Sequence, residues 1–468
     1  MPMRQIKTVS PLRALLAVAL PMVISQASDT VMLFADRLMV SRLGGRYLAA
    51  AMSGGITHVT VAAFFVGLVG YVNAIAAQYN GAGRTERCSS AVFQALLVGL
   101  AAYPLMLLIT PLARWLFVFA GHGAEQTDLE YLYFRILMGG SIFTVMRAGF
   151  VGFFLGIGKT KVVMLANIAG MLINLPANYL LIYGAGGFPA LGLAGAAYGT
   201  IIGSAAGVFI LAAVYLGPSC RRVYATHRSA SWEPAMIRRL LRFGLPAGVD
   251  QILTVATFTF FLEFMHSYGT DVAAAVTTAF NWDFVAYVPM MGMGAAVTSV
   301  VGTCIGAGDL ARARRTTYVA LAAAWTYSGT MLLAFVLFAP SLAALVLRDA
   351  PGGGEAMPLA VTMIRLMSFY TLADSVQLIF GGALRGAGDT HAVMRISLTV
   401  NWLFTGLSFV LIRILMVKPL TMWVCYIVFV MLWGAAIFLR YRCGRWKDIR
   451  LIGAKTPPPD GDGGETGK

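Results

Sequence analysis

The residues best suited to chemistry in this chain are acids within long apolar runs. Asp374 lies in the run 357–384, eleven residues before Arg385, which is about 16 Å at the α-helical rise. If Arg385 marks the water interface, Asp374 lies near the middle of a bilayer core about 30 Å thick. An ionisable group at that depth is costly and is a functional hypothesis by default. We therefore predict a functional carboxylate at Asp374, with a water-filled vestibule and no chemistry as the structural alternative.

Two further pairs of polar side chains share helical faces. Asp29 and Asp36 are seven residues apart, and Asn174 and Asn178 are four apart around Pro176. These spacings place side chains on one face of a helix, and the proline removes a backbone donor. Such groups suit the coordination of a cation or the relay of a proton. The structural alternatives are a solvated helix end at Asp36 and a simple kink at Pro176.

The second half of the chain carries its own acids. Asp250, Glu263 and Asp283 lie within apolar runs, and the last two are candidates for an ion or proton site together with Asp374. Polar, aromatic and methionine side chains could line an adaptable cleft. The candidates for this cleft are Asp29, Gln26, Gln251, Asn281, Trp282, Tyr287, Met290 and Gln377. For the aromatic and methionine residues, ordinary helix packing or lipid contact is the alternative.

Arg147 is a cation at a similar depth. It lies twelve residues before Lys159, about 18 Å along a helix. An intramembrane arginine needs an acidic partner or water, and the sequence does not identify the partner.

Three glycine-containing strings resemble catalytic motifs but are better explained as turns. The string 156–160 resembles a phosphate-binding loop, but Phe153 stands where that loop requires its first glycine. The strings 306–309 and 386–389 read Gly-Ala-Gly-Asp and match the Gly-x-Gly-Asp pattern of intramembrane aspartyl proteases, which need a second acid nearby to share a proton. Asp374 is about four turns from Asp389 along one helix. A protease is therefore the weaker alternative, and no enzyme activity is expected.

Composition places these acids in a polytopic membrane protein. The 468 residues are 59% hydrophobic and 12% charged, with a mean hydropathy of +0.76, which is far more apolar than a soluble domain. The 35 Lys and Arg outnumber 20 Asp and Glu. They cluster between apolar runs, which indicates membrane topology rather than nucleic-acid binding. The 5 cysteines show no paired or metal-ligand spacing, so neither a disulfide framework nor a cofactor or structural metal is expected.

About twelve apolar runs are long enough to cross a bilayer as helices. Their expected bounds are 13–36, 49–79, 90–111, 129–155, 162–183, 191–216, 237–267, 271–304, 317–347, 357–384, 392–417 and 419–440. Basic residues concentrate in alternate gaps between these runs, so the positive-inside rule places both termini in the cytoplasm. We expect a multi-pass protein of the cytoplasmic (inner) membrane.

The two halves of the chain repeat each other. A shift of about 225 residues, the first repeat shift, superimposes 81–83 on 306–308. A second repeat shift, of about 230, superimposes Gly156 and Gly158 on Gly386 and Gly388. Six spans in each half place the halves in the same orientation, related by an axis along the membrane normal. The prediction is an all-α protein with an N-terminal lobe, a linker, a C-terminal lobe and a disordered tail. Their bounds are 1–217, 218–236, 237–440 and 441–468.

Three stretches resemble the multidrug and toxic compound extrusion (MATE) transporters, most closely the bacterial NorM-type branch. They are the first run with Pro21 and Asp36, the stretch 174–184, and the stretch 374–390. The resemblance covers about residues 10–440. It implies a two-lobed antiporter that exports organic cations, amphipathic compounds and drugs in exchange for sodium or protons, and we expect it to be monomeric. It also implies that Asp36, with Asn174 and Asn178, belongs to a cavity in the first lobe.

One position departs from this resemblance. NorM-type members commonly carry a glutamate in the seventh span, eight residues after its proline, where this chain has Thr254. Glu263 or Asp283 is the candidate replacement. The alternative within transport is a flippase for a lipid-linked precursor, which should show a strongly cationic central cleft. The sequence distinguishes neither sodium from protons nor one substrate from another.

Overall fold

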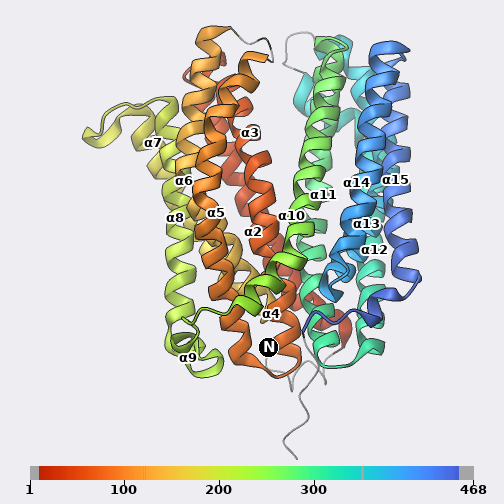
Figure 1. Cartoon of the computed structure of the whole chain (residues 1–468). Helices are drawn as coiled ribbons and strands as arrows, with labels where there is room; N and C mark the ends of the chain where they lie inside the picture. Colours follow the sequence, from red (N-terminus) through yellow and green to blue (C-terminus); the bar gives the residue numbers. More distant parts are fainter. Residues whose placement is uncertain (1–9, 120, 122, 349–352, 453–468) are drawn as a thin grey trace, which may run out of the picture.

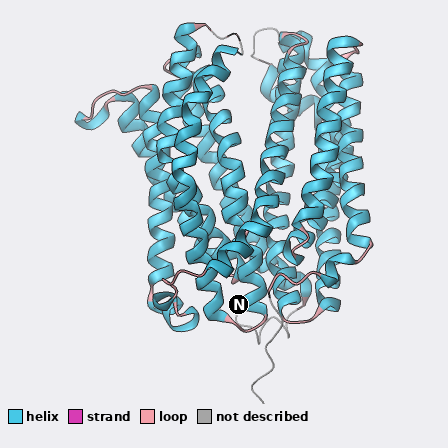
Figure 2. Cartoon of the chain, viewed as in Figure 1, coloured by secondary structure: helices cyan, strands magenta, loops and turns pink. Residues whose placement is uncertain are grey.

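The computed structural model describes residues 10–119, 121, 123–348 and 353–452 (Figure 1). Figure 2 shows helices joined by loops, with no strand among the described residues. Within these residues, 12 helices are long and apolar enough to cross a membrane, which confirms the predicted fold class. The α-helices are α2 (Pro11–Ser41), α3 (Gly45–Gly70), α4 (Val72–Gly81), α5 (Thr85–Phe119), α6 (Ala124–Gly156), α7 (Thr160–Tyr183), α8 (Leu193–Leu216), α9 (Pro218–Tyr224), α10 (Pro234–His266), α11 (Thr270–Gly306), α12 (Leu310–Leu347), α13 (Gly353–Ala387), α14 (Thr390–Phe409) and α15 (Pro419–Arg442).

Local sequence signals set the ends of these helices. Proline stands in the first turn of α2, α9, α10 and α15, where its fixed φ and missing N–H are tolerated. Ser10 caps α2 and Asp309 caps α12, each by accepting a hydrogen bond from a backbone N–H three residues later. Gly158 and Gly388 have φ of 72° and 98° between consecutive helices, a backbone conformation that favours glycine. These positions support the interpretation of the glycine strings as turns.

The repeated glycines lie where the two lobes meet. Helices α2 to α8 form the first lobe and α10 to α15 the second, and they stand side by side in Figure 1. At the lower end of that view, Gly81 of α4 lies against Thr303, and Gly306 of α11 lies against Gln78. A Cβ built on either glycine would collide with the carbonyl oxygen of its neighbour. The first repeat shift converts one contact into the other, as expected for lobes related by a pseudo-two-fold axis.

The first helix of each half contributes to the core of the opposite lobe. Leu15 and Val18 of α2 belong to the hydrophobic cluster of the second lobe. Leu240 and Phe243 of α10 belong to the cluster of the first lobe. The first repeat shift superimposes these two pairs as well. The lower ends of α2 and α10 therefore tie the lobes together through buried packing.

Hydrogen bonds between the lobes add to this contact. The Tyr71 hydroxyl donates to the carbonyl of Arg385 at 3.0 Å. In return, the Ser299 hydroxyl of the second lobe donates to the carbonyl of Leu155 in the first lobe at 2.5 Å. Leu155 and Arg385 are equivalent under the second repeat shift. The lower end is therefore closed by paired contacts that involve both repeats.

The C-terminal segment differs from the prediction of a disordered tail that begins at residue 441. Helix α15 continues to Arg442, and a 3₁₀ helix, η4 (Arg445–Asp448), follows it. Leu451 is only 1% exposed. The prediction is wrong for residues 441–452, because buried apolar side chains anchor a segment whose polar neighbours indicated disorder. Residues 453–468 lie outside the described residues.

The closed lower end predicts a specific sensitivity at Gly306. In Gly306→Ala, the added Cβ meets the backbone of Gln78, and overpacking of this kind costs about 1–3 kcal/mol. The ratio of the closed to the open form should fall by about 5- to 150-fold. Spin labels on the exposed positions Ala49 and Thr270, at the starts of α3 and α11, should report this as a shorter separation between the upper ends of the lobes.

The matched control is Gly329→Ala, because a Cβ built on Gly329 meets no atom within 4 Å. Native cysteines are replaced in both variants so that only the two labels report. Identical distance distributions in the two variants would contradict a role for the glycine contact in closure.

Candidate functional site

A buried carboxylate cluster lies within the first lobe. Asp36 of α2 is 6% exposed and accepts hydrogen bonds from the Asn178 side-chain amide and, at 3.2 Å, from the Thr200 hydroxyl. The Asn178 amide also donates to the Asn174 side-chain oxygen at 3.4 Å. The structure therefore brings together Asp36, Asn174 and Asn178. It adds Thr200 of α8, which sequence reasoning missed because a lone hydroxyl in an apolar run gives no distinctive signal.

The packing of α7 against α8 positions this cluster. Asn174 Nδ2 and Asn178 Oδ1 are buried and have no hydrogen-bond partner among the described residues. A Cβ built on Gly199 of α8 would overlap Asn178 Oδ1, so only glycine leaves room for this amide. Unsatisfied buried polar groups are uncommon in native proteins and call for a functional or structural explanation.

The partner of Arg147, which the sequence left open, is Asp29. Arg147 donates to the two carboxylate oxygens of Asp29 at 3.1 and 3.3 Å. Asn167 of α7 joins the pair, since its side-chain oxygen accepts from Arg147 at 3.3 Å and its amide donates to Asp29 at 3.2 Å. A bidentate pair of this kind holds both charges in a defined geometry. Asp29 therefore serves as a counter-ion within the first lobe.

Two acids of the second lobe form another group. Asp283 of α11 and Asp374 of α13 lie close enough to interact electrostatically with each other and with Tyr287. Asp283 also interacts with Tyr370. Glu263, the other candidate from the sequence, is exposed on α10 and is not part of this group. The structure thus places Asp283, rather than Glu263, beside Asp374.

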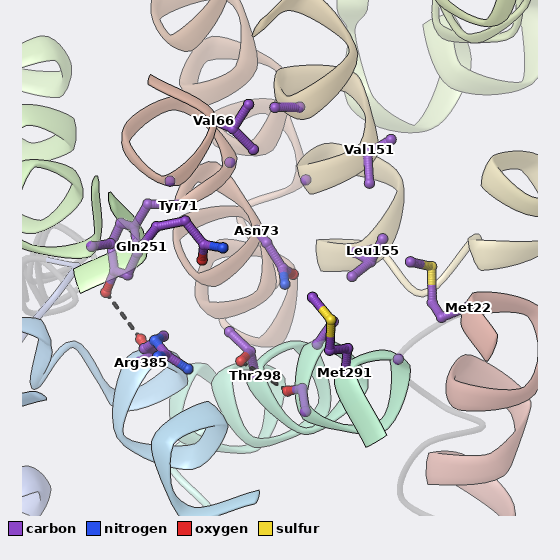
Figure 3. A pocket seen from close by; sticks show the side chains of 18 of the residues that line it. Met22, Val66, Tyr71, Asn73, Val151, Leu155, Gln251, Met291, Thr298 and Arg385 are labelled. Carbon is purple, nitrogen blue, oxygen red and sulfur yellow. Dashed lines mark hydrogen bonds between the residues drawn. The ribbon is translucent and has the colours of Figure 1, made fainter. Parts of the chain in front are cut away.

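A cavity of about 370 Å³ lies between the lobes, lined by residues of α2, α3, α4 and α6 and of α10, α11 and α13 (Figure 3). Four predicted cleft residues line it: Gln26, Gln251, Tyr287 and Gln377. Asn73 and Thr298, which the first repeat shift superimposes, line it from opposite lobes. Sequence reasoning missed this pair, although two polar residues at equivalent repeat positions were a usable signal.

Three other predicted cleft residues lie away from this cavity. Trp282 donates its Nε1–H to the carbonyl of Leu342 at 3.0 Å, between α11 and α12. Met290 is 4% exposed within the core of the second lobe, and the cavity is lined by Met291 instead. Asn281 is exposed. These residues therefore take the packing or surface positions that were the structural alternative.

The positive charge at the cavity is neutralised by an acid. Arg385 is the only arginine among the described residues that line the cavity, and it pairs with Asp250 at 2.5 Å. Asp250 is 2% exposed. Thr254 also lines the cavity, and its hydroxyl donates to the carbonyl of Asp250 at 2.9 Å. The cavity is therefore not strongly cationic.

The acids of the Gly-Ala-Gly-Asp strings have structural partners. Asp389 accepts hydrogen bonds from the Arg440 guanidinium at 2.7 and 3.1 Å. Asp309 caps α12 by accepting from the backbone N–H of Arg312 at 2.8 Å. In the part of the chain that the structure describes, no group of three or more His, Cys, Asp or Glu residues could hold a metal ion.

The ion pair of the first lobe predicts a large effect on stability. Asp29→Asn leaves the partly buried Arg147 charge without its counter-ion, which should cost more than the loss of an exposed pair and at most the about 3–5 kcal/mol of a fully buried one. Thermal unfolding in detergent should show a clear fall in Tm. The control is Glu125→Gln, which breaks the exposed pair with Arg46 and should cost about 0–1 kcal/mol. Equal losses in the two variants would show that the Asp29 pair has no special structural role.

Comparisons with known proteins agree with this fold. The MatE family model matches residues 21–180 and 246–410, two segments that begin at positions equivalent under the first repeat shift. A solved structure of MATE in complex with MaL6 is 22% identical, with a TM-score of 0.86, covering 95% of this chain and 99% of that chain.

Two further structures have the same fold at the same 22% identity. A MOP superfamily transporter from Pyrococcus furiosus, described with a binding pocket of reverse polarity, has a TM-score of 0.85 and covers 95% of this chain and 98% of that chain. An outward-facing multidrug resistance MATE family transporter has the same TM-score and coverage. Since the family model matches well over half of its residues, the chain belongs to the MatE family of membrane transporters.

Proposed function

We propose that this chain is a secondary active antiporter that exports cationic or amphipathic organic compounds in exchange for sodium or protons. The observation that carries the proposal is that, of six acids named above, only half are paired with an arginine. Three acids pair with an arginine, and three have no ion pair with a basic residue of the described chain. The paired acids are Asp29, Asp250 and Asp389, and the unpaired acids are Asp36, Asp283 and Asp374.

The unpaired acids are suited to bind mobile cations. A carboxylate that is poorly solvated and has no fixed counter-ion is stabilised by a proton, a metal cation or a cationic substrate. When an ion and a substrate compete for one acid, each lowers the affinity of the other by the same factor. An acid that is already paired with arginine cannot couple two flows in this way.

The two groups of acids suit different kinds of coupling ion. Asp36 accepts hydrogen bonds from the Asn178 amide and the Thr200 hydroxyl. Together with the nearby side-chain oxygen of Asn174, its carboxylate offers the oxygen ligands that hard cations prefer. Asp283 and Asp374 repel each other when both are ionised, and neighbouring carboxylates are stabilised by sharing a proton. We assign the coupling ion or proton to both groups.

The substrate is assigned to the cavity between the lobes. Tyr71 and Tyr287 contribute aromatic surface, and Met22 and Met291 contribute flexible apolar surface. Aromatic faces attract organic cations, and methionine adapts to different shapes. Gln377 of α13 lines the cavity three residues after Asp374 and connects it to the acids of the second lobe.

The closed lower end defines the state of the transport cycle. With both termini in the cytoplasm, as we propose for an inner-membrane protein, the contacts of Gly81 and Gly306 seal the cytoplasmic side. In this state an external ion neutralises the unpaired acids and favours release of a cationic substrate. Loss of the ion after the lobes reopen toward the cytoplasm restores the negative charge, which binds the next substrate.

A flippase for a lipid-linked precursor is less well supported. Such a protein needs positive charge in its central cavity to bind pyrophosphate or phosphate groups. Here Arg385 is paired with Asp250, so its charge is already compensated.

Removal of the charge at Asp374 should abolish coupling. Asp374→Asn in proteoliposomes should reduce ion-driven efflux of a fluorescent organic cation by about tenfold or more, within the usual range of coupling energies. Glu263→Gln is the matched control, because it removes an exposed acid from the same lobe. A sodium gradient and a proton gradient, applied separately, identify the ion. Normal efflux in Asp374→Asn would refute the assignment.

The packing around Asn178 allows a second test that leaves every acid in place. In Gly199→Ala, the added Cβ displaces the amide that hydrogen-bonds Asp36. The ion concentration for half-maximal efflux should rise by about tenfold, the equivalent of one lost hydrogen bond to a charged group. Gly406→Ala, where a Cβ meets no atom within 4 Å, should leave it unchanged. An unaltered ion dependence in Gly199→Ala would remove this cluster from the coupling site.

A further inference from the structure

A basic pocket of about 520 Å³ lies at the lower end of the molecule. It is formed by the start of α10, the turn before α14 together with its first residues, and the C-terminal segment after η4. Its charged and titratable lining residues are Arg238, Arg239, Arg242, Asp389, His391 and Arg450. Its apolar lining includes Phe243, Ile449 and Leu451. The pocket is separate from the cavity between the lobes, and the transport proposal does not use it.

Two acids near the arginines of α10, Asp389 and Glu233, are already engaged. Asp389 accepts two hydrogen bonds from Arg440, which is not among the lining residues. Glu233, just before α10, pairs with Arg87 at 2.5 Å. Neither carboxylate is therefore available to neutralise the arginines of the pocket.

Three guanidinium groups of the pocket have no anionic partner among the described residues: Arg238, Arg242 and Arg450. A fourth, Arg239, donates to the Tyr79 hydroxyl, which is neutral. Like charges around one concave surface repel each other. Planar guanidinium groups match the several oxygens of a phosphate, which accepts two parallel hydrogen bonds from each.

We propose that this pocket binds a phosphate-bearing anion, supplied either by the headgroup of an anionic lipid or by a soluble phosphate compound. Basic pockets at the cytoplasmic ends of membrane helices are suited to anionic headgroups. The volume of about 520 Å³ accommodates a phosphate with attached groups. The apolar lining of Phe243 and Leu451 suits a ligand that is not purely ionic.

The bound anion also fastens the C-terminal segment to α10. Leu451 packs in the hydrophobic cluster of the first lobe together with Phe243. Phe243 stacks on Tyr71, with 6.4 Å between the ring centroids. The Tyr71 hydroxyl reaches Arg385 across the closed lower end. An anion held by Arg242 and Arg450 therefore strengthens contacts that keep this end closed.

Membrane topology alone also places arginines at this face. Arg221 and Arg222 of α9 provide the comparison, since both are exposed at the same end and neither lines the pocket. Two double variants remove the same amount of charge from this end of the molecule. The α10 variant, Arg238→Gln/Arg242→Gln, removes it from the pocket, and the α9 variant, Arg221→Gln/Arg222→Gln, removes it outside the pocket. Arg450→Gln tests the pocket from the C-terminal segment.

Binding is measured as the rise in Tm in two arms. In neutral detergent, inorganic phosphate is titrated against chloride at equal ionic strength. In nanodiscs, phosphatidylglycerol is titrated into phosphatidylcholine. The wild type and the α9 variant should be stabilised at the same ligand concentration. The α10 variant and Arg450→Gln should need a ligand concentration at least about tenfold higher for the same rise in Tm, as expected when a charge-assisted hydrogen bond is lost.

Each outcome decides the proposal. Stabilisation in the phosphate arm alone identifies a soluble ligand, stabilisation in the lipid arm alone identifies a headgroup, and either result, or both together, supports the pocket. The proposal is overturned if the α9 and α10 variants lose the ligand-induced rise in Tm to the same extent. It is also overturned if neither ligand stabilises the wild type. The mutated side chains are exposed, so the unliganded Tm should not change. If the α10 variant fails to fold, Arg450→Gln decides alone.

Discussion

Gly81 and Gly306 allow the backbones of the two lobes to approach where any side chain would collide with a carbonyl group. This approach brings the Gln78 amide within 2.8 Å of the carbonyl of Gly386, so one polar bond accompanies the close packing. In a lipid environment, small residues drive helix association because they permit such contact, while the hydrophobic effect between helices is weak. The arrangement of the cavity above this point, with Asn73 and Thr298 on opposite walls, depends on it.

The acids of α2 show how neighbouring helices decide the role of a residue. Asp29 and Asp36 are seven residues apart on one helix, and their spacing gives them the same face. Asp29 meets Arg147 of α6, whereas Asp36 meets only amide and hydroxyl groups of α7 and α8. One carboxylate therefore stabilises the lobe, and the other has no ion pair with a basic residue of the described chain. The second lobe shows the same difference, since Asp250 is paired with Arg385 and Asp374 has no ion pair with a basic residue of the described chain.

Much of the architecture follows from the sequence, because the number of spans depends on hydropathy and the two lobes on a repeat that is visible in the glycines. Contacts between helices are different. The pairing of Asp29 with Arg147 could not be predicted, since spacing within α2 carries no information about which helix it faces. Met290 and Met291 show the same limit, because successive residues point about 100° apart on a helix and only the packing selects the one that lines the cavity. The order at Leu451 depends on a tertiary contact with the first-lobe cluster.

The exchange of core residues between α2 and α10 has a consequence for the origin and synthesis of the chain. The first lobe lacks Leu240 and Phe243 until the start of α10 has been made, so its core stays incomplete when its own last helix, α8, leaves the ribosome. A symmetric homodimer of six-helix chains, each adding the beginning of its first helix to the core of its partner, would contain the same contacts. Joining two such copies by a linker would have required no new packing, and the present chain would preserve the interface of that ancestral dimer.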